Sequence, residues 1–132
     1  MLAVLLCQIP TPVLHTRLKR KFRLNKTLDY QRVRRNGKSY AHPLIVLIAL
    51  PNEMAHARVG VSASRTIGNA VQRNRAKRLL REAIRPLLPL THPGWDLIFL
   101  SRSGIRQATL QEIKAAMVSV LEQANLIMRT YD

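Results

Sequence analysis

Cysteine, acidic residues and aromatic residues are all scarce in this 132-residue chain. The single cysteine, Cys7, excludes an internal disulfide and is typical of a protein from a reducing compartment, the cytoplasm. The seven Asp and Glu residues are dispersed along the sequence, and the four histidines show no metal-ligand spacing. Because a two-metal nuclease needs several converging carboxylates, we expect neither a metal site nor a catalytic residue in this chain.

Long apolar runs are also absent. The opening MLAVLLCQIP is too short to cross a bilayer and lacks the basic start of a signal peptide, and the longest later run, LIVLIAL, has the length of a strand. We therefore expect no membrane segment. No linker divides the chain, so we expect a variable, disordered extension over residues 1–16, one folded domain over 17–127 and a short tail over 128–132.

Positive charge, by contrast, is abundant: 22 Lys and Arg residues give a formal net charge of +15. Apolar residues make up 47% of the chain, which excludes a disordered basic tail and predicts a packed core. Self-repulsion of this size destabilises a compact fold, so we expect a partner that supplies negative charge. Nucleic acid is the first candidate partner, and an anionic membrane surface is the second.

The hydrophobic pattern predicts three helices, which cover residues 27–36, 69–85 and 109–127 and begin at the N-caps Thr27, Asn69 and Thr109. Gln72 and Glu112 lie three residues after the second and third caps, as in a capping box. The first helix has Leu28 and Val33 as its apolar residues and Gly37 as its C-terminal stop.

Three apolar runs predict strands over residues 44–50, 57–64 and 95–101. The segment PNEMAH lies between the first two runs and is typical of a turn, so we expect these two strands to pair as a hairpin. The basic segment 16–26 has no clean periodicity and is expected to be extended and mobile. Together the elements predict an α+β class, a single-domain α–β sandwich with helices packed on a sheet.

The second predicted helix contains GNAVQRNRAKRLLRE, a segment dense in arginine. On a helical wheel the apolar face carries Ala76, Leu79, Leu80, Ala83 and Ile84, and the opposite face carries Asn74, Arg75, Lys77, Arg78, Arg81 and Arg85, with Arg73 at the border. A solvated helix usually mixes charges of both signs, whereas Glu82 is the one acidic residue of this segment. We therefore favour a polyanion-binding face over a merely solvated one, because guanidinium groups bind phosphate oxygens in bidentate fashion.

The same segment resembles the arginine-rich motif of the bacterial ribonuclease P protein family, centred on Arg73-Asn74-Arg75. The neighbouring ARVGVSASRT, LDYQRVRRNGKSYAHPLIVL and WDLIFLSR are similar to the strands and first helix of that family. The resemblance covers about residues 17–125. It implies a four-stranded sheet in the order αβββαβα, like the second domain of a small-subunit ribosomal protein, with a left-handed β–α–β crossover.

The resemblance also implies a function. Ribonuclease P is an endoribonuclease that removes the 5′ leader from precursor tRNA, and in that family the chemistry belongs to a catalytic RNA and its Mg²⁺ ions. The protein subunit binds this RNA and the leader. The expected partners are therefore the catalytic RNA and precursor tRNA, with no DNA, no membrane and no second copy of the protein.

Matching the family's motif residue by residue gives two sets of candidates. The RNA-subunit binding set is Arg65, Asn69, Arg73, Asn74, Arg75, Lys77, Arg78 and Arg81. The leader-binding cleft is expected to contain Tyr30, Arg34, Val46 and Ile48. The family usually has phenylalanine at Tyr30 and frequently has aromatic residues at Arg34 and Ile48, so this sequence predicts a more electrostatic grip on the leader. The alternative is that Tyr30 belongs to the hydrophobic core and does not contact the leader.

A second function remains open at this point. A plain RNA-binding structural protein of ribosomal type would have the same charge and a similar sheet. The two functions differ in one experiment, because only the ribonuclease P subunit would let a catalytic RNA process precursor tRNA in dilute Mg²⁺.

Overall fold

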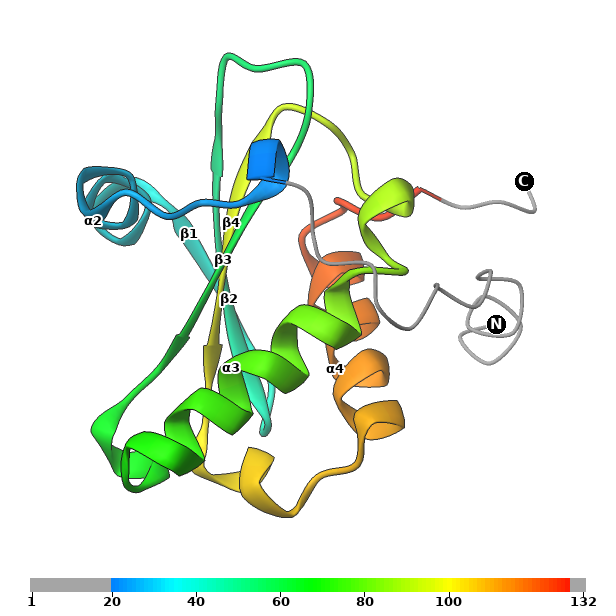
Figure 1. Cartoon of the computed structure of the whole chain (residues 1–132). Coiled ribbons are helices and arrows are strands. Elements are labelled where there is room, and N and C mark those ends of the chain that lie inside the picture. Colours follow the sequence, from blue (N-terminus) through cyan, green and yellow to red (C-terminus); the bar gives the residue numbers. More distant parts are fainter. Residues whose placement is uncertain (1–19, 129–132) are drawn as a thin grey trace.

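The computed structural model describes residues 20–128, so the expected extension 1–16 and nearly all of the expected tail lie outside the described residues. The described part contains the helices α2 (Thr27–Asn36), α3 (Ala70–Ile84) and α4 (Leu110–Gln123) and the strands β1 (Lys38–Ala41), β2 (Ile45–Pro51), β3 (Arg58–Ala63) and β4 (Trp95–Ser101). Short 3-10 turns are η1 (Arg20–Phe22), η2 (Arg65–Ile67), η3 (Leu88–Leu90) and η4 (Ser103–Gln107). The predicted order αβββαβα is confirmed (Figure 1).

The strands form one mixed sheet in the order β1-β2-β4-β3. β2 pairs antiparallel with β4, and β3 runs parallel to β4 on its other side. The predicted hairpin between residues 44–50 and 57–64 is therefore wrong, because β4 lies between these two strands. β4 lies inside the sheet, and most of its residues are buried, as expected of a strand that is covered on both faces.

The hairpin partner of β2 is β1, in which Tyr40 lies opposite Leu47. The sequence pattern did not predict β1, because its four residues KSYA are mostly exposed and do not form an apolar run. The parallel neighbours β3 and β4 are connected through α3, which is the β–α–β crossover implied by the resemblance. The left-handedness of this crossover stays a prediction.

The sheet separates two hydrophobic cores. The main core lies between the sheet and the helices α3 and α4, and it includes Leu47 of β2. The second core, formed by Leu24, Val33, Ile48 and Ile98, lies on the opposite face under α2. Figure 1 shows α2 on one side of the sheet and α3 and α4 on the other. One face is thus covered by two helices and the other by a single short one.

The start of the described chain differs from the sequence-based expectation. The Leu24 N–H donates to the Val59 carbonyl at 2.8 Å, and Leu24 is buried in the second core. Residues 23 and 24 thus lie against β3, and the mobility expected for the segment 16–26 stays a prediction. Thr27 is the first residue of α2 rather than its N-cap, and Lys26 holds the cap position without a side-chain hydrogen bond. Leu28 is 78% exposed, so Val33 is the residue that anchors α2 in the core.

The other two predicted N-caps are confirmed. Asn69 and Thr109 both form complete capping boxes with the residue three positions on. α4 ends at Gln123 rather than at residue 127, because Asn125 adopts a φ of 57° in the left-handed region that terminates helices. Within residues 20–128, no helix has the length and apolarity needed to cross a bilayer.

Candidate nucleic-acid interface

The arginine-rich helix α3 is fixed at its N-terminus by hydrogen bonds at both ends of a capping box. The Gln72 N–H donates to Asn69 Oδ1 at 2.9 Å, and the Asn69 N–H donates to Gln72 Oε1 at 2.9 Å. The preceding Gly68 has a φ of 140°, and a Cβ there would lie 1.7 Å from Gln72 Oε1. Glycine is thus required for the chain to turn from η2 into α3 at this point.

The two predicted faces of α3 are confirmed. Ala76, Leu80, Ala83 and Ile84 are buried in the main core. Six members of the predicted RNA-binding set are exposed, namely Arg65, Asn69, Asn74, Arg75, Arg78 and Arg81. Arg73 and Lys77 are half-buried at the edge of the packed face. Arg85 is partly buried at the C-cap rather than in the exposed row, and its Nε has no hydrogen-bond partner within the described chain.

The exposed face of α3 has no neutralising partner inside the described part of the protein. The ion pairs between residues 20 and 128 all involve Asp29 or Asp96, and neither carboxylate contacts α3. Several arginines on one helix without acidic partners repel one another, and a bound polyanion removes that repulsion. This face is therefore suited to binding phosphate groups.

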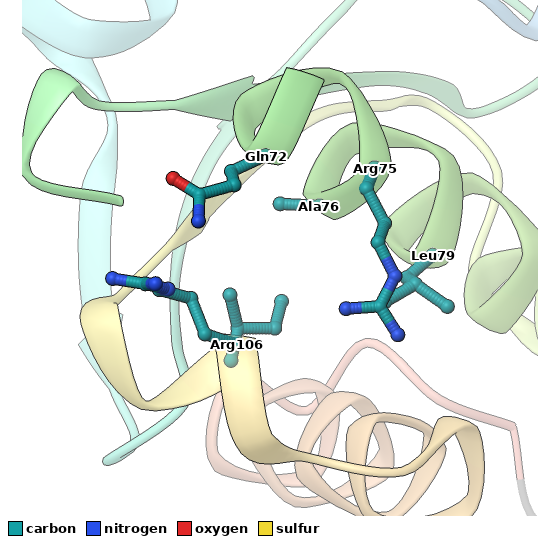
Figure 2. Close-up of a pocket in the computed structure, with 6 residues that line it drawn as sticks. Gln72, Arg75, Ala76, Leu79 and Arg106 are labelled. Atoms are coloured by element: carbon teal, nitrogen blue, oxygen red, sulfur yellow. The ribbon is translucent and has the colours of Figure 1, made fainter. Parts of the chain in front are cut away.

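A small hollow lies beside α3, where the helix faces η4. Its volume is about 160 Å³, and its lining residues are Gln72, Arg75, Ala76, Leu79, Ile105 and Arg106 (Figure 2). Arg106 is exposed and belongs to neither set of residues that the sequence predicted. The hollow is apolar at its base and carries guanidinium groups at its sides.

The predicted leader cleft lies on the face of the sheet that α2 covers. Tyr30 projects from α2 onto β3, where its hydroxyl donates to the Val61 carbonyl at 3.2 Å. A Cβ at Gly60 would lie 2.4 Å from the Tyr30 oxygen, so glycine makes room for the ring. Burial raises the pKa of Tyr30, and this effect exceeds the lowering by the Val61 hydrogen bond and by the nearby charge of Arg81. Tyr30 is thus a neutral, half-buried ring between α2 and β3.

The other predicted cleft residues differ in how accessible they are. Arg34 is exposed and lies one helical turn after Tyr30, on the same side of α2. Val46 is half-buried and pairs across the ladder with Leu100, which is also half-buried. Ile48 is 7% exposed and packs in the second core. Val46 and Leu100 thus form a pair of partly accessible apolar side chains on this face of the sheet. The sequence pattern did not single out Leu100, although its position next to the buried Phe99 in a strand places the two side chains on opposite faces.

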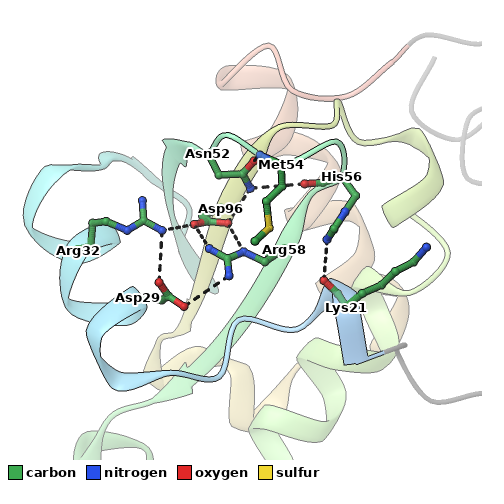
Figure 3. A network of polar contacts seen from close by, with 8 residues as sticks. All are labelled: Lys21, Asp29, Arg32, Asn52, Met54, His56, Arg58 and Asp96. Atoms are coloured by element: carbon green, nitrogen blue, oxygen red, sulfur yellow. Dashed lines mark hydrogen bonds and ion pairs between the residues drawn. The ribbon is translucent and has the colours of Figure 1, made fainter.

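A buried carboxylate joins α2 to the end of the sheet. Figure 3 shows Asp96 of β4 surrounded by Arg32, Asn52 and Arg58. Burial alone would raise the pKa of Asp96, but the hydrogen bonds from Arg58, Asn52 and Arg32 outweigh it and hold this pKa below its usual range. Asp29 of α2 completes the network with Arg58 at 3.5 Å and Arg32 at 3.7 Å.

The network brings together two acidic residues that are far apart in the chain, because Asp29 and Asp96 both contact Arg32 and Arg58. Both carboxylates face guanidinium groups, which leaves no open pair of acidic oxygens for a cation. Residues 20–128 contain no group of three or more His, Cys, Asp or Glu side chains that could hold a metal ion.

Comparisons with known proteins identify the family. Residues 18–125 match the model of the Ribonuclease P family. The chain is 40% identical to the ribonuclease P protein component of Herpetosiphon aurantiacus over 109 residues, which cover 83% of this chain and 89% of that protein. Its identity to the corresponding protein of Roseiflexus castenholzii is 36% over 111 residues, covering 83% of this chain and 91% of the relative.

Solved structures agree with the sequence relatives. The structure of the Staphylococcus aureus RNase P protein matches with a TM-score of 0.72 and 32% sequence identity, covering 80% of this chain and 97% of that one. The arginine-rich helix, the mixed sheet and these similarities lead to the same conclusion. The chain belongs to the family of ribonuclease P protein components.

Proposed function

We propose that this subunit of ribonuclease P binds the catalytic RNA through the exposed face of α3 and the 5′ leader of precursor tRNA in the cleft beside Tyr30. The observation that carries the proposal is the row of exposed arginines on α3, which has no acidic partner in the described chain and lies opposite a buried apolar face. Helix α3 would thereby use one side for folding and the other for RNA.

In this proposal the RNA, with its Mg²⁺ ions, carries out the cleavage of the leader in the cytoplasm. The acidic residues between positions 20 and 128 support this division of labour, because the two carboxylates that converge there, Asp29 and Asp96, are bound to arginines. A two-metal site would need such carboxylates free to coordinate cations. The contribution of the protein is then to position the substrate and to screen the phosphate charges of two RNA molecules.

Leader binding is supported by the geometry of the α2 side of the sheet. Tyr30 and Arg34 lie along one side of α2, and Val46 and Leu100 are accessible on the neighbouring strands. An aromatic ring and apolar side chains contact bases, whereas a guanidinium contacts phosphates. A single strand of RNA has both groups available, unlike a duplex whose bases are stacked inside.

The test is reconstitution of the enzyme from the full chain and its cognate ribonuclease P RNA. In dilute Mg²⁺ the RNA alone should cleave precursor tRNA poorly, and adding the protein should restore cleavage at the mature 5′ end. Arg78→Ala should lower this stimulation at limiting protein concentration. An RNA-binding structural protein of ribosomal type would bind RNA but leave the cleavage rate unchanged.

A further inference from the structure

The hollow between α3 and η4 has hydrogen-bond donors at its sides and apolar groups at its base. Arg75 lines it from α3 and Arg106 from η4 (Figure 2). The buried side chains of Ala76 and Ile105 contribute apolar lining. Within the described chain neither guanidinium has a carboxylate partner. Two cations that share one hollow repel each other unless an anion lies between them.

The third polar group of the hollow, Gln72, is held in an orientation that adds another donor. Its Oε1 accepts the Asn69 N–H at 2.9 Å in the capping box. This bond fixes which end of the amide is the oxygen, so the Nε2 group is the end left for a ligand. In Figure 2 this nitrogen points toward Arg106. The hollow therefore presents amide and guanidinium N–H groups and is complementary to an anion.

The size of the hollow limits the kind of anion. Its volume of about 160 Å³ is below the roughly 300–1,000 Å³ of typical cofactor and drug-sized sites. It is larger than the volume that one water molecule occupies in liquid water, about 30 Å³. A phosphate group fits between these limits, and the apolar base could contact the attached sugar.

We propose that this hollow binds one phosphodiester group of the ribonuclease P RNA, held jointly by Arg75 and Arg106. The inference rests on the proposed function of α3 and extends it, because the RNA-binding surface would continue from α3 across to η4. Arg106 would then be an RNA-binding residue outside the arginine-rich motif. The phosphate would also offset the repulsion between the two guanidinium groups.

The position of the hollow favours the catalytic RNA over the leader as the source of the phosphate. On α3, Arg75 and Leu79 lie on the flank that faces η4, whereas Arg81 lies on the other side and acts on Tyr30. The hollow and the leader cleft are therefore separated by the helix. An RNA that lies across the exposed face of α3 reaches the hollow without entering the cleft.

The experiment measures the affinity of the full chain for the cognate ribonuclease P RNA across a salt series. Arg106→Gln should weaken binding about tenfold or more, which is the typical effect of losing one charge-assisted hydrogen-bonded contact. It should also reduce the slope of log affinity against log salt by about one unit. Arg102→Gln is the matched control, because Arg102 is exposed at the start of the same turn but does not line the hollow. That variant should bind like the wild type.

A double-mutant cycle tests whether the two arginines hold the same phosphate. Arg75→Gln and Arg106→Gln combined should weaken binding by clearly less than the product of the single effects. If the effects of the two substitutions on affinity multiplied exactly, the two arginines would not hold the same phosphate, and the shared site would be overturned. Wild-type affinity of Arg106→Gln, with weak binding of Arg78→Ala, would overturn the inference while leaving the proposed function intact. Wild-type affinity of both variants would remove the proposed function itself.

A last arm separates the two RNA sources. If Arg106→Gln kept its affinity for the ribonuclease P RNA but the assembled enzyme bound precursor tRNA more weakly, the phosphate would belong to the substrate. That result would overturn the assignment to the catalytic RNA.

Discussion

Arg58 and Asp96 form a bidentate pair across neighbouring strands, with Nε–Oδ1 at 2.9 Å and Nη2–Oδ2 at 2.8 Å. The two residues are register partners in the parallel ladder of β3 and β4. Arg32 adds a contact from α2, so one buried carboxylate holds three elements together. Because α2 also carries Tyr30 and Arg34, this pair helps to position the candidate leader cleft.

Removing the charge of Asp96 should therefore destabilise the fold. Asp96→Asn removes the buried charge of the pair and leaves the half-buried Arg58 with only the more distant Asp29 carboxylate, and breaking a buried pair costs up to about 3–5 kcal/mol. The measurement is the free energy of unfolding in urea. Glu53→Gln is the matched control, because Glu53 is exposed and should change stability by less than about 0.5 kcal/mol. Equal stability of the two variants would show that the network contributes nothing.

The same carboxylate predicts a dependence of stability on pH. The folded-state pKa of Asp96 is lowered, so its stabilising contribution is fully present above its unfolded pKa of about 3.9. The contribution is lost as the pH falls from there through the folded pKa. The difference in unfolding free energy between wild type and Asp96→Asn should shrink as acid is added. A difference that stays constant down to strongly acidic pH would contradict the lowered pKa.

The buried face of α3 gives a prediction about packing. Leu80 and Ile84 are fully buried in the main core, so truncation of either to alanine should cost about 2–5 kcal/mol. Val71 lies on the same helix but is 76% exposed, and Val71→Ala serves as the control. Thermal and urea unfolding measure the effect. Neutral Leu80→Ala and Ile84→Ala variants would mean that the assignment of the helix faces is reversed.

The exposed face of α3 should contribute to assembly rather than to stability. Arg78→Ala should leave the melting temperature almost unchanged, because this side chain is exposed and unpaired in the described chain. It should weaken binding of the ribonuclease P RNA and reduce the salt slope by about one unit. Arg73→Ala and Arg75→Ala should act in the same direction. The matched control is Arg35→Ala, an exposed arginine on α2. A large drop in melting temperature with unchanged affinity would make Arg78 a structural residue.

The leader cleft should respond to changes at Arg34 and Tyr30. A guanidinium binds phosphate with a strong salt dependence, so Arg34→Phe should flatten the salt dependence of precursor-tRNA binding by the assembled enzyme. Tyr30→Ala should lose about 1–3 kcal/mol of affinity if a base stacks on this ring.

Two controls make this prediction specific. Tyr30→Phe removes the hydrogen bond to Val61 but keeps the ring, so it should retain most of the affinity. Mature tRNA, which has no leader, should bind equally to all variants. Equal losses for precursor and mature tRNA would show that neither side chain contacts the leader.

Local sequence signals predicted the three helices and two of their three N-caps. The caps at Asn69 and Thr109 and the two faces of α3 depend on residues within a few positions of one another, so the sequence alone determined them. The end of α4 was missed because Asn125, not glycine, takes the left-handed conformation there.

Contacts between distant segments were not predictable in the same way. β2 and β3 are consecutive strands, yet β4 lies between them, and no local rule indicates such an insertion. The partners of Asp96 come from α2, β3 and the loop after β2, so their convergence depends on the assembled sheet. The hollow beside Arg106 likewise requires η4 to fold back against α3.

The central position of β4 has a consequence for biosynthesis. The chain leaves the ribosome from its N-terminus, so β2 and β3 are made well before residues 95–101, which separate and pair with both of them. Until β4 emerges, the strands that flank it have no partner at the edges where it will lie. Helix α3 connects β3 to β4 and packs against the finished sheet, so its buried apolar face is exposed during this interval. The nascent protein therefore passes through a stage in which its most basic segment is already synthesised but has no scaffold to present it to RNA.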